Sequence, residues 1–312
     1  MAISLYWIQC GGCGGDTMSF LSAETPDVVE LFAACDISVL WHPSLSNLSV
    51  SESRSLTQSL VSGEKPLDIL VVEGNLVFGP NESGAFDTKD GRPKKDLVYD
   101  LAMKARYVIA AGTCAAFGGI GVGSETDGRG LQFVRDQPGG LLPPEFRSGA
   151  GLPVINLAGC PVHPAVLAST IESVAAGAAM PLDRFQRPAD WYGTLVHQGC
   201  TRNEYHEYRV EETQFGEKGC LFFYMGCHGP LVGGPCNKKL WNERSSKTRV
   251  GVSCFGCTDP MFPQSAPFFE TRSIAGVPIK LPRGVDRAHY LAYKSMAAAA
   301  APQRLIDRKS EV

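Results

Sequence analysis

Eleven cysteines occur in the 312 residues of this chain, and most of them stand beside a glycine or in a short pair. The first pair, Cys10 and Cys13, lies in the sequence CGGCGG directly after an apolar run. Cys114 follows the run YVIAAGT, and Cys160 follows VINLAG. In a reducing compartment, cysteines at such spacings are more often metal ligands or catalysts than disulfide partners. The pattern therefore points to metal chemistry.

The glycines around the first pair favour an inorganic anion over a nucleotide. A glycine-rich turn between a strand and a helix commonly binds phosphate through its backbone N–H groups. Gly11, Gly12, Gly14 and Gly15 do not follow the order G-x-G-x-x-G that dinucleotide binding requires. We expect these glycines to let backbone amides approach an iron–sulfur cluster.

Residues 1–180 alternate between strand and helix patterns, which predicts a flavodoxin-like doubly wound parallel sheet in an α/β domain. The expected strands are near-continuous apolar runs, typical of strands that are buried on both faces. They lie at residues 4–9, 36–42, 68–74, 106–112 and 152–159. The expected helices cover residues 26–34, 53–62, 95–105 and 164–178.

This topology gathers four cysteines at one edge of the sheet, because the carboxyl ends of parallel strands share an edge where ligands bind. Four thiolates suit zinc or an iron–sulfur cluster. Ligands from three separate strand ends favour the larger cluster. Glu73 ends the strand DILVVE at the same edge. It is expected to tune the cluster, to serve a proton path, or to cap a backbone amide. The four cysteines are Cys10, Cys13, Cys114 and Cys160.

Residues 181–312 predict an irregular domain that metal ligands stabilise. The segment is rich in Gly and Pro and has few regular periods. Loops of this length need another source of order, and metal binding can supply folding free energy. The candidate ligands in this domain are His197, Cys200, Cys220, Cys227, Cys236, Cys254 and Cys257.

Composition excludes several other classes of function. The net charge is −3 and there is no basic stripe, which argues against nucleic-acid binding. No stretch approaches the ~20 apolar residues that span a bilayer. The N-terminus MAISLYWIQC has no basic region and no twin-arginine pair. We therefore expect a cytoplasmic protein without a transmembrane segment, which reaches a membrane, if at all, through a partner.

Eight motifs together resemble the small subunit of nickel–iron hydrogenases. They are CGGC, VVEGN, GTCAAFGGI, INLAGCPVHP, HQGCTRNEY, GCLFFYMGCHGP, CNKKLWN and CFGCTDPMFP. The resemblance implies a proximal cluster on Cys10, Cys13, Cys114 and Cys160. It implies a distal cluster on His197, Cys200, Cys220 and Cys227, and a medial cluster on Cys236, Cys254 and Cys257. Cys35 has no place in this scheme and is expected in the core.

The resemblance also implies the partners. The nickel–iron centre of the family belongs to a separate large subunit, so this chain would carry electrons from hydrogen oxidation through three iron–sulfur clusters. The acceptor would be a quinone or an electron-carrier protein, and the heterodimers would form a higher oligomer. The family usually has proline where this chain has Lys247. With three cysteines and no fourth thiol, the medial cluster is expected to be 3Fe–4S, and the three clusters together are expected to include both 4Fe–4S and 3Fe–4S types.

The departures from the family favour a cytoplasmic uptake hydrogenase of the group 2-like branch. Gly12 and Gly119 stand where the oxygen-tolerant membrane-bound branch has extra thiols. The alternative is the small subunit of a hydrogen-sensing hydrogenase. Two further alternatives are a cluster subunit of respiratory complex I and a zinc-stabilised binding module. The complex I subunit shares only the first domain. The zinc module would be colourless, so visible absorbance separates it from a cluster protein.

Overall fold

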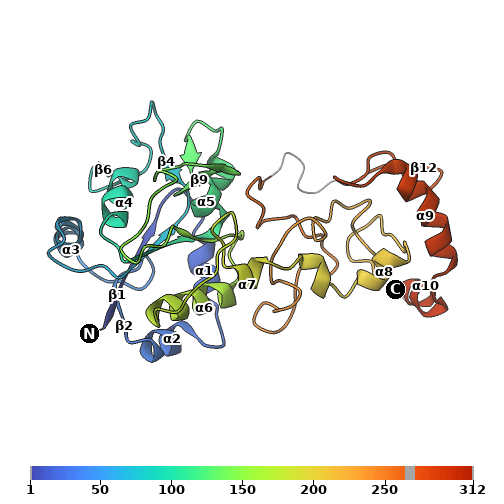
Figure 1. Cartoon of the computed structure of the whole chain (residues 1–312), viewed down its shortest axis with the longest axis horizontal. Coiled ribbons are helices and arrows are strands. Elements are labelled where there is room, and N and C mark those ends of the chain that lie inside the picture. The colour runs from blue at the N-terminus through green and yellow to red at the C-terminus, as the bar shows by residue number, and fades with distance from the viewer. Residues whose placement is uncertain (1, 264–270, 311–312) are drawn as a thin grey trace. The chain divides into compact units, whose positions relative to one another are not determined.

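The structure, a computed structural model, describes residues 2–263 and 271–310. The chain divides into two compact units. The first consists of Met1–Trp191 together with Cys257–Phe262, and the second of Tyr192–Gly256 together with Pro263–Val312. Figure 1 follows the chain through both units from blue to red.

A five-stranded parallel sheet forms the centre of the first unit. Its order, β11-β7-β3-β1-β2, is the flavodoxin-like order that the sequence predicts. Every residue of β3, β7 and β11 is buried, which explains their continuous apolar runs. The strands are β1 (Ile3–Gln9), β2 (Ile37–Trp41), β3 (Ile69–Glu73), β7 (Tyr107–Ala111) and β11 (Ile155–Leu157).

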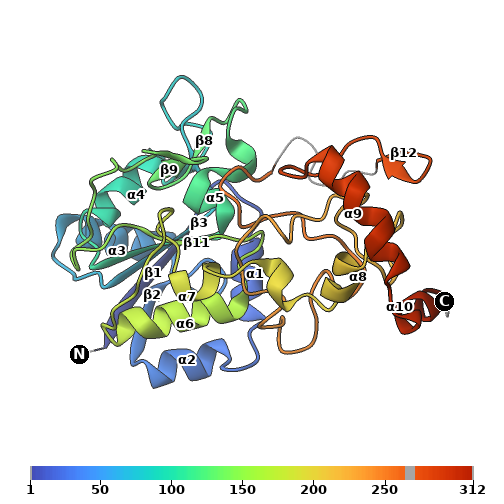
Figure 2. The same cartoon turned by 45° about the vertical axis from the view of Figure 1, so that its right-hand side comes forward.

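Helices cover both faces of this sheet (Figures 1 and 2). On one face lie α1 (Gly15–Leu21), α2 (Val28–Ala34) and α6 (Pro164–Ala175), and on the other α3 (Val50–Ser62) and α4 (Lys94–Ala102). Helix α3 begins with a capping box, in which Ser49 and Glu52 satisfy each other's backbone N–H groups.

The strand register brings the carboxyl ends of four strands into one row. Gln9 lies opposite Glu73, Glu73 opposite Ala111, and Ala111 opposite Leu157. The chain turns directly from β7 into α5 (Gly112–Phe117). The remaining elements here are short: β4 (Leu76–Val77), β5 (Thr88–Lys89), β6 (Arg92–Pro93), η1 (Gly119–Gly121), β8 (Gly128–Arg129), β9 (Phe133–Val134), β10 (Gln137–Pro138) and α7 (Ala189–Tyr192).

The second unit has little regular structure before its C-terminal helices. Its elements are η2 (Val196–Gly199), α8 (Asn203–Glu207), β12 (Ser273–Ile274), β13 (Val277–Pro278), α9 (Arg287–Ala299) and α10 (Gln303–Ser310). The irregular middle agrees with the sequence prediction, but α9 and α10 were not predicted. Among residues 2–263 and 271–310, no helix is long and apolar enough to cross a membrane.

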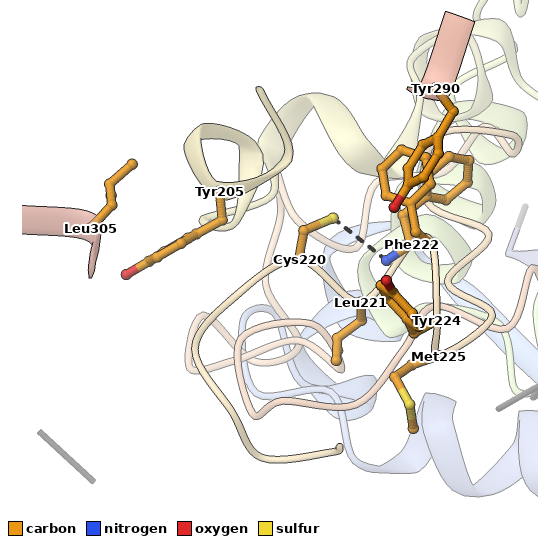
Figure 3. Packing of buried hydrophobic residues seen from close by; sticks show 9 residues of the cluster. Tyr205, Cys220, Leu221, Phe222, Tyr224, Met225, Tyr290 and Leu305 are labelled. Carbon is orange, nitrogen blue, oxygen red and sulfur yellow. Dashed lines mark hydrogen bonds between the residues drawn. The ribbon is translucent and has the colours of Figure 1, made fainter. Parts of the chain in front are cut away.

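An aromatic core holds the second unit together, which the sequence reading did not foresee. The segment Cys220–Met225 is buried throughout and packs with Tyr205, Tyr290 and Leu305 (Figure 3). Tyr290 comes from α9 and Leu305 from α10, so both C-terminal helices close over this segment. Because Cys220 belongs to the core, the packing also fixes a candidate metal ligand.

Candidate metal centres

Three of the predicted thiols meet at the carboxyl edge of the sheet. Cys13 is exposed on the turn after β1, and Cys114 lies in the first turn of α5. Cys160 follows β11, and its thiol lies within electrostatic range of the other two. Burial and, to a smaller extent, the nearby thiolates raise the pKa of the Cys160 thiol to about 12. A bound metal cation would offset the cost of holding several thiolates here.

Asp16 is a fourth potential ligand at this edge, and sequence reasoning missed it. Its charge acts on the thiols of both Cys114 and Cys160. Its Oδ1 accepts a hydrogen bond from Val162 N at 2.7 Å. A Cβ on Gly112 would lie 2.1 Å from Asp16 Oδ2, so only glycine fits beside this carboxylate. Burial raises the pKa of Asp16 to about 7. The signal was the spacing Cys13-x-x-Asp16, which repeats the C-x-x-C spacing.

Cys10 has different charged neighbours from Cys160. Side chains alternate along β1, so Cys10 continues the face of Tyr6, whose hydroxyl contacts Thr57 on α3. The Cys10 thiol is buried, and burial raises its pKa to about 12, with further effects from Asp87 and Lys94. The charges that act on the Cys10 thiol are those of Asp87, Lys94 and Glu73, whereas those that act on the Cys160 thiol include Cys13, Asp16 and Cys114. The geometry thus supports Asp16, and not Cys10, beside these thiols.

Glu73 caps helix α1. Its buried carboxylate accepts the backbone N–H groups of Asp16 and Thr17 at 3.0 Å each, as well as the hydroxyl of Thr17. Trp7 Nε1 donates to the same carboxylate at 3.1 Å. A carboxylate at a helix N-terminus satisfies orphan donors and interacts favourably with the helix dipole. Of the roles expected for Glu73, the structure contains the cap, and this cap positions Asp16.

Cys257 belongs to the first unit, where Thr113 holds its backbone. The Thr113 hydroxyl donates to the carbonyl oxygen of Cys257 and accepts from Gly159 N at 2.9 Å. Thr113 and Gly159 each precede a candidate ligand, Cys114 and Cys160. The charge of Cys257 also acts on the Cys160 thiol. Cys257 is therefore fixed next to the loops that present the first centre.

Cys200, Cys220 and Cys227 come together in the second unit. The charges of Cys200 and Cys227 act on the Cys220 thiol, and burial raises the pKa of Cys220 and Cys227. Backbone N–H groups point at two of the sulfurs, Arg202 N to Cys200 Sγ at 3.4 Å and Phe222 N to Cys220 Sγ at 3.5 Å (Figure 3). Such donors stabilise thiolates, the form that binds metal.

Two histidines, not one, lie at this second centre. His197 is where the sequence places a ligand, and its ring centroid is 4.7 Å from that of His206. His206 Nδ1 is 3.4 Å from Cys220 Sγ. Burial lowers the pKa of both imidazoles, that of His206 to about 4. His206 was missed because only the spacing His197-x-x-Cys200 suggested a ligand.

Cys236 and Cys254 lie in the second unit, where two other side chains near them in the sequence are already engaged. The Lys247 ammonium lies 4.6 Å from the ring centroid of Phe255. The Ser246 hydroxyl donates to Asn237 Oδ1 at 2.5 Å. Neither group is presented as a ligand.

The arrangement of the thiols fits a cluster better than a single zinc ion. With Zn–S bonds of about 2.3 Å, neighbouring sulfurs of a tetrahedral zinc site lie about 3.8 Å apart. Among the described residues, no three ligand atoms that include a cysteine sulfur lie within 4.8 Å of one another. Wider spacing leaves room for several irons and their sulfides.

The remaining cysteine, Cys35, is half-buried at the end of α2 and is not the core residue expected.

Two family models match separate parts of the chain. Residues 192–270 match the C-terminal part of the NiFe/NiFeSe hydrogenase small subunit. Residues 13–174 match the 20 Kd subunit of NADH ubiquinone oxidoreductase. The second match covers the first unit alone, whereas the first covers the cysteine-rich region that follows.

Full-length relatives match both parts in one chain. The F420 non-reducing hydrogenase I small subunit of Methanosarcina mazei is 30% identical over 305 residues, covering 88% of this chain and 78% of that protein. The periplasmic [NiFe] hydrogenase small subunit 1 of Nitratidesulfovibrio vulgaris is 28% identical, covering 86% and 82%. Among solved structures, an actinobacterial-type NiFe-hydrogenase from Ralstonia eutropha H16 superposes with a TM-score of 0.81 at 28% identity, covering 99% and 89%.

Proposed function

This chain belongs to the family of nickel–iron hydrogenase small subunits, and from that premise we propose that it carries three iron–sulfur clusters in an uptake hydrogenase. It is the electron-transfer subunit of the enzyme and works in complex with the large subunit that contains the nickel–iron site. Bound clusters would accept and release single electrons that hydrogen oxidation supplies. The residues of this chain would hold the clusters in place.

We propose a ligand set for each cluster. The proximal 4Fe–4S cluster binds to Cys13, Asp16, Cys114 and Cys160, with Asp16 in the place first expected for Cys10. The distal 4Fe–4S cluster binds to His197, Cys200, Cys220 and Cys227. The medial 3Fe–4S cluster binds to Cys236, Cys254 and Cys257. The observation that carries the proposal is the convergence of three thiols and a buried carboxylate from separate loops at the edge of the sheet.

The finer assignments extend the family function. We propose the direction of hydrogen uptake, a quinone or an electron-carrier protein as acceptor, a cytoplasmic location and a higher oligomer of heterodimers. A hydrogen-sensing subunit would use the same clusters. Sustained hydrogen-dependent dye reduction by the purified complex, at many turnovers per second, would separate uptake from sensing.

Metal analysis tests the proposal directly. The complex with the large subunit should contain roughly 11 iron atoms in this chain, the sum of two four-iron clusters and one three-iron cluster. Hydrogen should bleach the visible absorbance of the clusters. The large subunit's own iron is subtracted using its nickel content, measured in the same sample. Stoichiometric zinc with little iron would overturn the cluster proposal.

The proximal edge is the face that we propose for large-subunit binding. Cys13 is exposed there, and two apolar side chains beside candidate ligands are 69% exposed, Met18 and Ile120. Ile120 lies next to Gly119, where a Cβ would lie 2.6 Å from Cys114 Sγ. Exposed apolar side chains around a site that must exchange electrons are typical of a covered interface.

A charge at this face should therefore weaken the complex. Ile120→Asp should lower co-purification of the large subunit at least tenfold, because association would bury an unpaired carboxylate. Val29→Asp is the matched control, since Val29 is 77% exposed on α2 and should tolerate the change. Pull-down at equal expression measures the effect. Equal loss in both variants, or no loss in Ile120→Asp, would place the interface elsewhere.

A further inference from the structure

His206 has a fixed position against a ligand of the distal centre. Its Nδ1 lies 3.4 Å from Cys220 Sγ, within hydrogen-bond reach of a sulfur. The ring stacks on Phe223 with centroids 5.6 Å apart and planes inclined by 15°. On other sides it meets the ring of Phe222 at 5.5 Å and the ring of His197 at 4.7 Å. Aromatic contacts thus fix the imidazole in one orientation.

The surrounding structure reinforces this orientation. Arg209 Nη1 donates to the carbonyl oxygen of His206 at 2.5 Å, and the Arg209 guanidinium lies over the Phe223 ring at 4.8 Å. Phe223 also contacts Tyr290 of α9, with ring centroids 4.9 Å apart. Helix α9 therefore supports Phe223, the ring on which His206 stacks.

We propose that His206 is a positioning residue that donates a hydrogen bond from Nδ1 to the Cys220 thiolate and raises the reduction potential of the distal cluster. The inference rests on the proposed distal ligand set. An electron added to a cluster increases the negative charge on its ligand sulfurs. A donor held at one of those sulfurs stabilises the reduced form more than the oxidised form, and such hydrogen bonds tune cluster potentials.

A different role for His206 is also testable. The ligand atoms of His197, His206 and Glu207 lie within 4.8 Å of one another, which would suit a single metal ion. Glu207 is exposed, and the ligand set already uses His197. A hydrogen bond from His206 to Cys220 is consistent both with the exposure of Glu207 and with the use of His197 as a cluster ligand.

The experiment uses the complete complex carrying His206→Phe, which keeps an aromatic ring on Phe223 but has no donor. An EPR-monitored redox titration reports the distal cluster separately from turnover. We expect full iron content and a roughly tenfold lower equilibrium constant for reducing this cluster, which is 59 mV for a one-electron step. His206→Gln keeps an amide donor and should lower the reduction potential of the distal cluster less than His206→Phe does. The control is His289→Phe, because the His289 side chain is 93% exposed, and it should titrate like wild type.

Three outcomes would overturn the proposal. The first is an unchanged distal potential in His206→Phe at full iron content. The second is loss of the distal signal and its irons in both His206 variants, which would make His206 a ligand. The third is a stoichiometric zinc ion that is lost with the imidazole. If the wild-type complex itself shows no distal cluster signal, the proposed distal cluster is wrong. This result is distinguishable from failure of the His206 proposal, which leaves the wild-type distal signal in place.

Discussion

Replacing Asp16 with Ala should remove or degrade the proximal cluster, whereas Cys10→Ala should leave it intact. The Asp16 carboxylate is fixed between Gly112 and Val162 N, and its charge acts on the thiols of Cys114 and Cys160. Without it, a four-iron cluster would have three protein ligands in this chain. Cys10 lies on the face of β1 toward Asp87 and Lys94, so its loss removes a small buried side chain at a cost of about 1–2 kcal/mol.

Iron content and EPR of the reduced complex measure this difference. Asp16→Ala should lose one to four irons and the proximal signal, and hydrogen should no longer reduce the outer clusters. Asp16→Cys should restore a cluster, because a thiolate is a stronger iron ligand than a carboxylate. A normal cluster in Asp16→Ala combined with iron loss in Cys10→Ala would restore the first sequence-based assignment.

The sheet was predictable because its strands are buried on both faces. Runs such as ILVVE in β3 and YVIAA in β7 leave no polar alternation that could suggest a surface strand. The parallel topology then follows from the helices between them, and it places the strand ends in one row. Cys114 and Cys160 could be placed at the edge for this reason alone.

The details of the proximal site depend on the path of a turn, which sequence spacing does not determine. Cys10 directly follows β1 and keeps the alternation of the strand, so its thiol stays on the α3 and α4 face. Asp16 lies inside α1, whose N-terminus is fixed by the distant Glu73. A search for thiols alone overlooked a carboxylate at ligand spacing.

The second unit was only half predictable for a related reason. Its loops read as irregular, and they are, but Cys220–Met225 forms an aromatic core with residues more than 60 positions away. Tyr290 packs there because α9 begins at a cap on Asp286, whose carboxylate accepts His289 N. His206 was overlooked because its role depends on the packing of Phe223, a tertiary contact without a local motif.

Oxidised wild-type complex should show the narrow, near-isotropic EPR signal of a three-iron medial cluster, and Lys247→Cys should abolish it. Lys247 follows Ser246 in the segment between Cys236 and Cys254, and its ammonium is held on the Phe255 ring. A protonated amine has no lone pair, and Ser246 already donates to Asn237, so neither supplies a fourth ligand. A thiolate at position 247 would favour a fourth iron and lower the potential, because it adds negative charge.

Lys247→Met separates a missing ligand from a missing cation. Methionine keeps the chain length and packs well against aromatic rings, but its thioether is a poor replacement for thiolate on iron. This variant should therefore keep the three-iron signal, while Lys247→Cys loses it and gains about one iron per complex. If Lys247→Met also lost the signal, the cation–π contact with Phe255 would be what preserves the cluster. A wild-type complex with no three-iron signal would refute the medial assignment. A fourth iron would then be bound by a ligand other than Lys247 or Ser246.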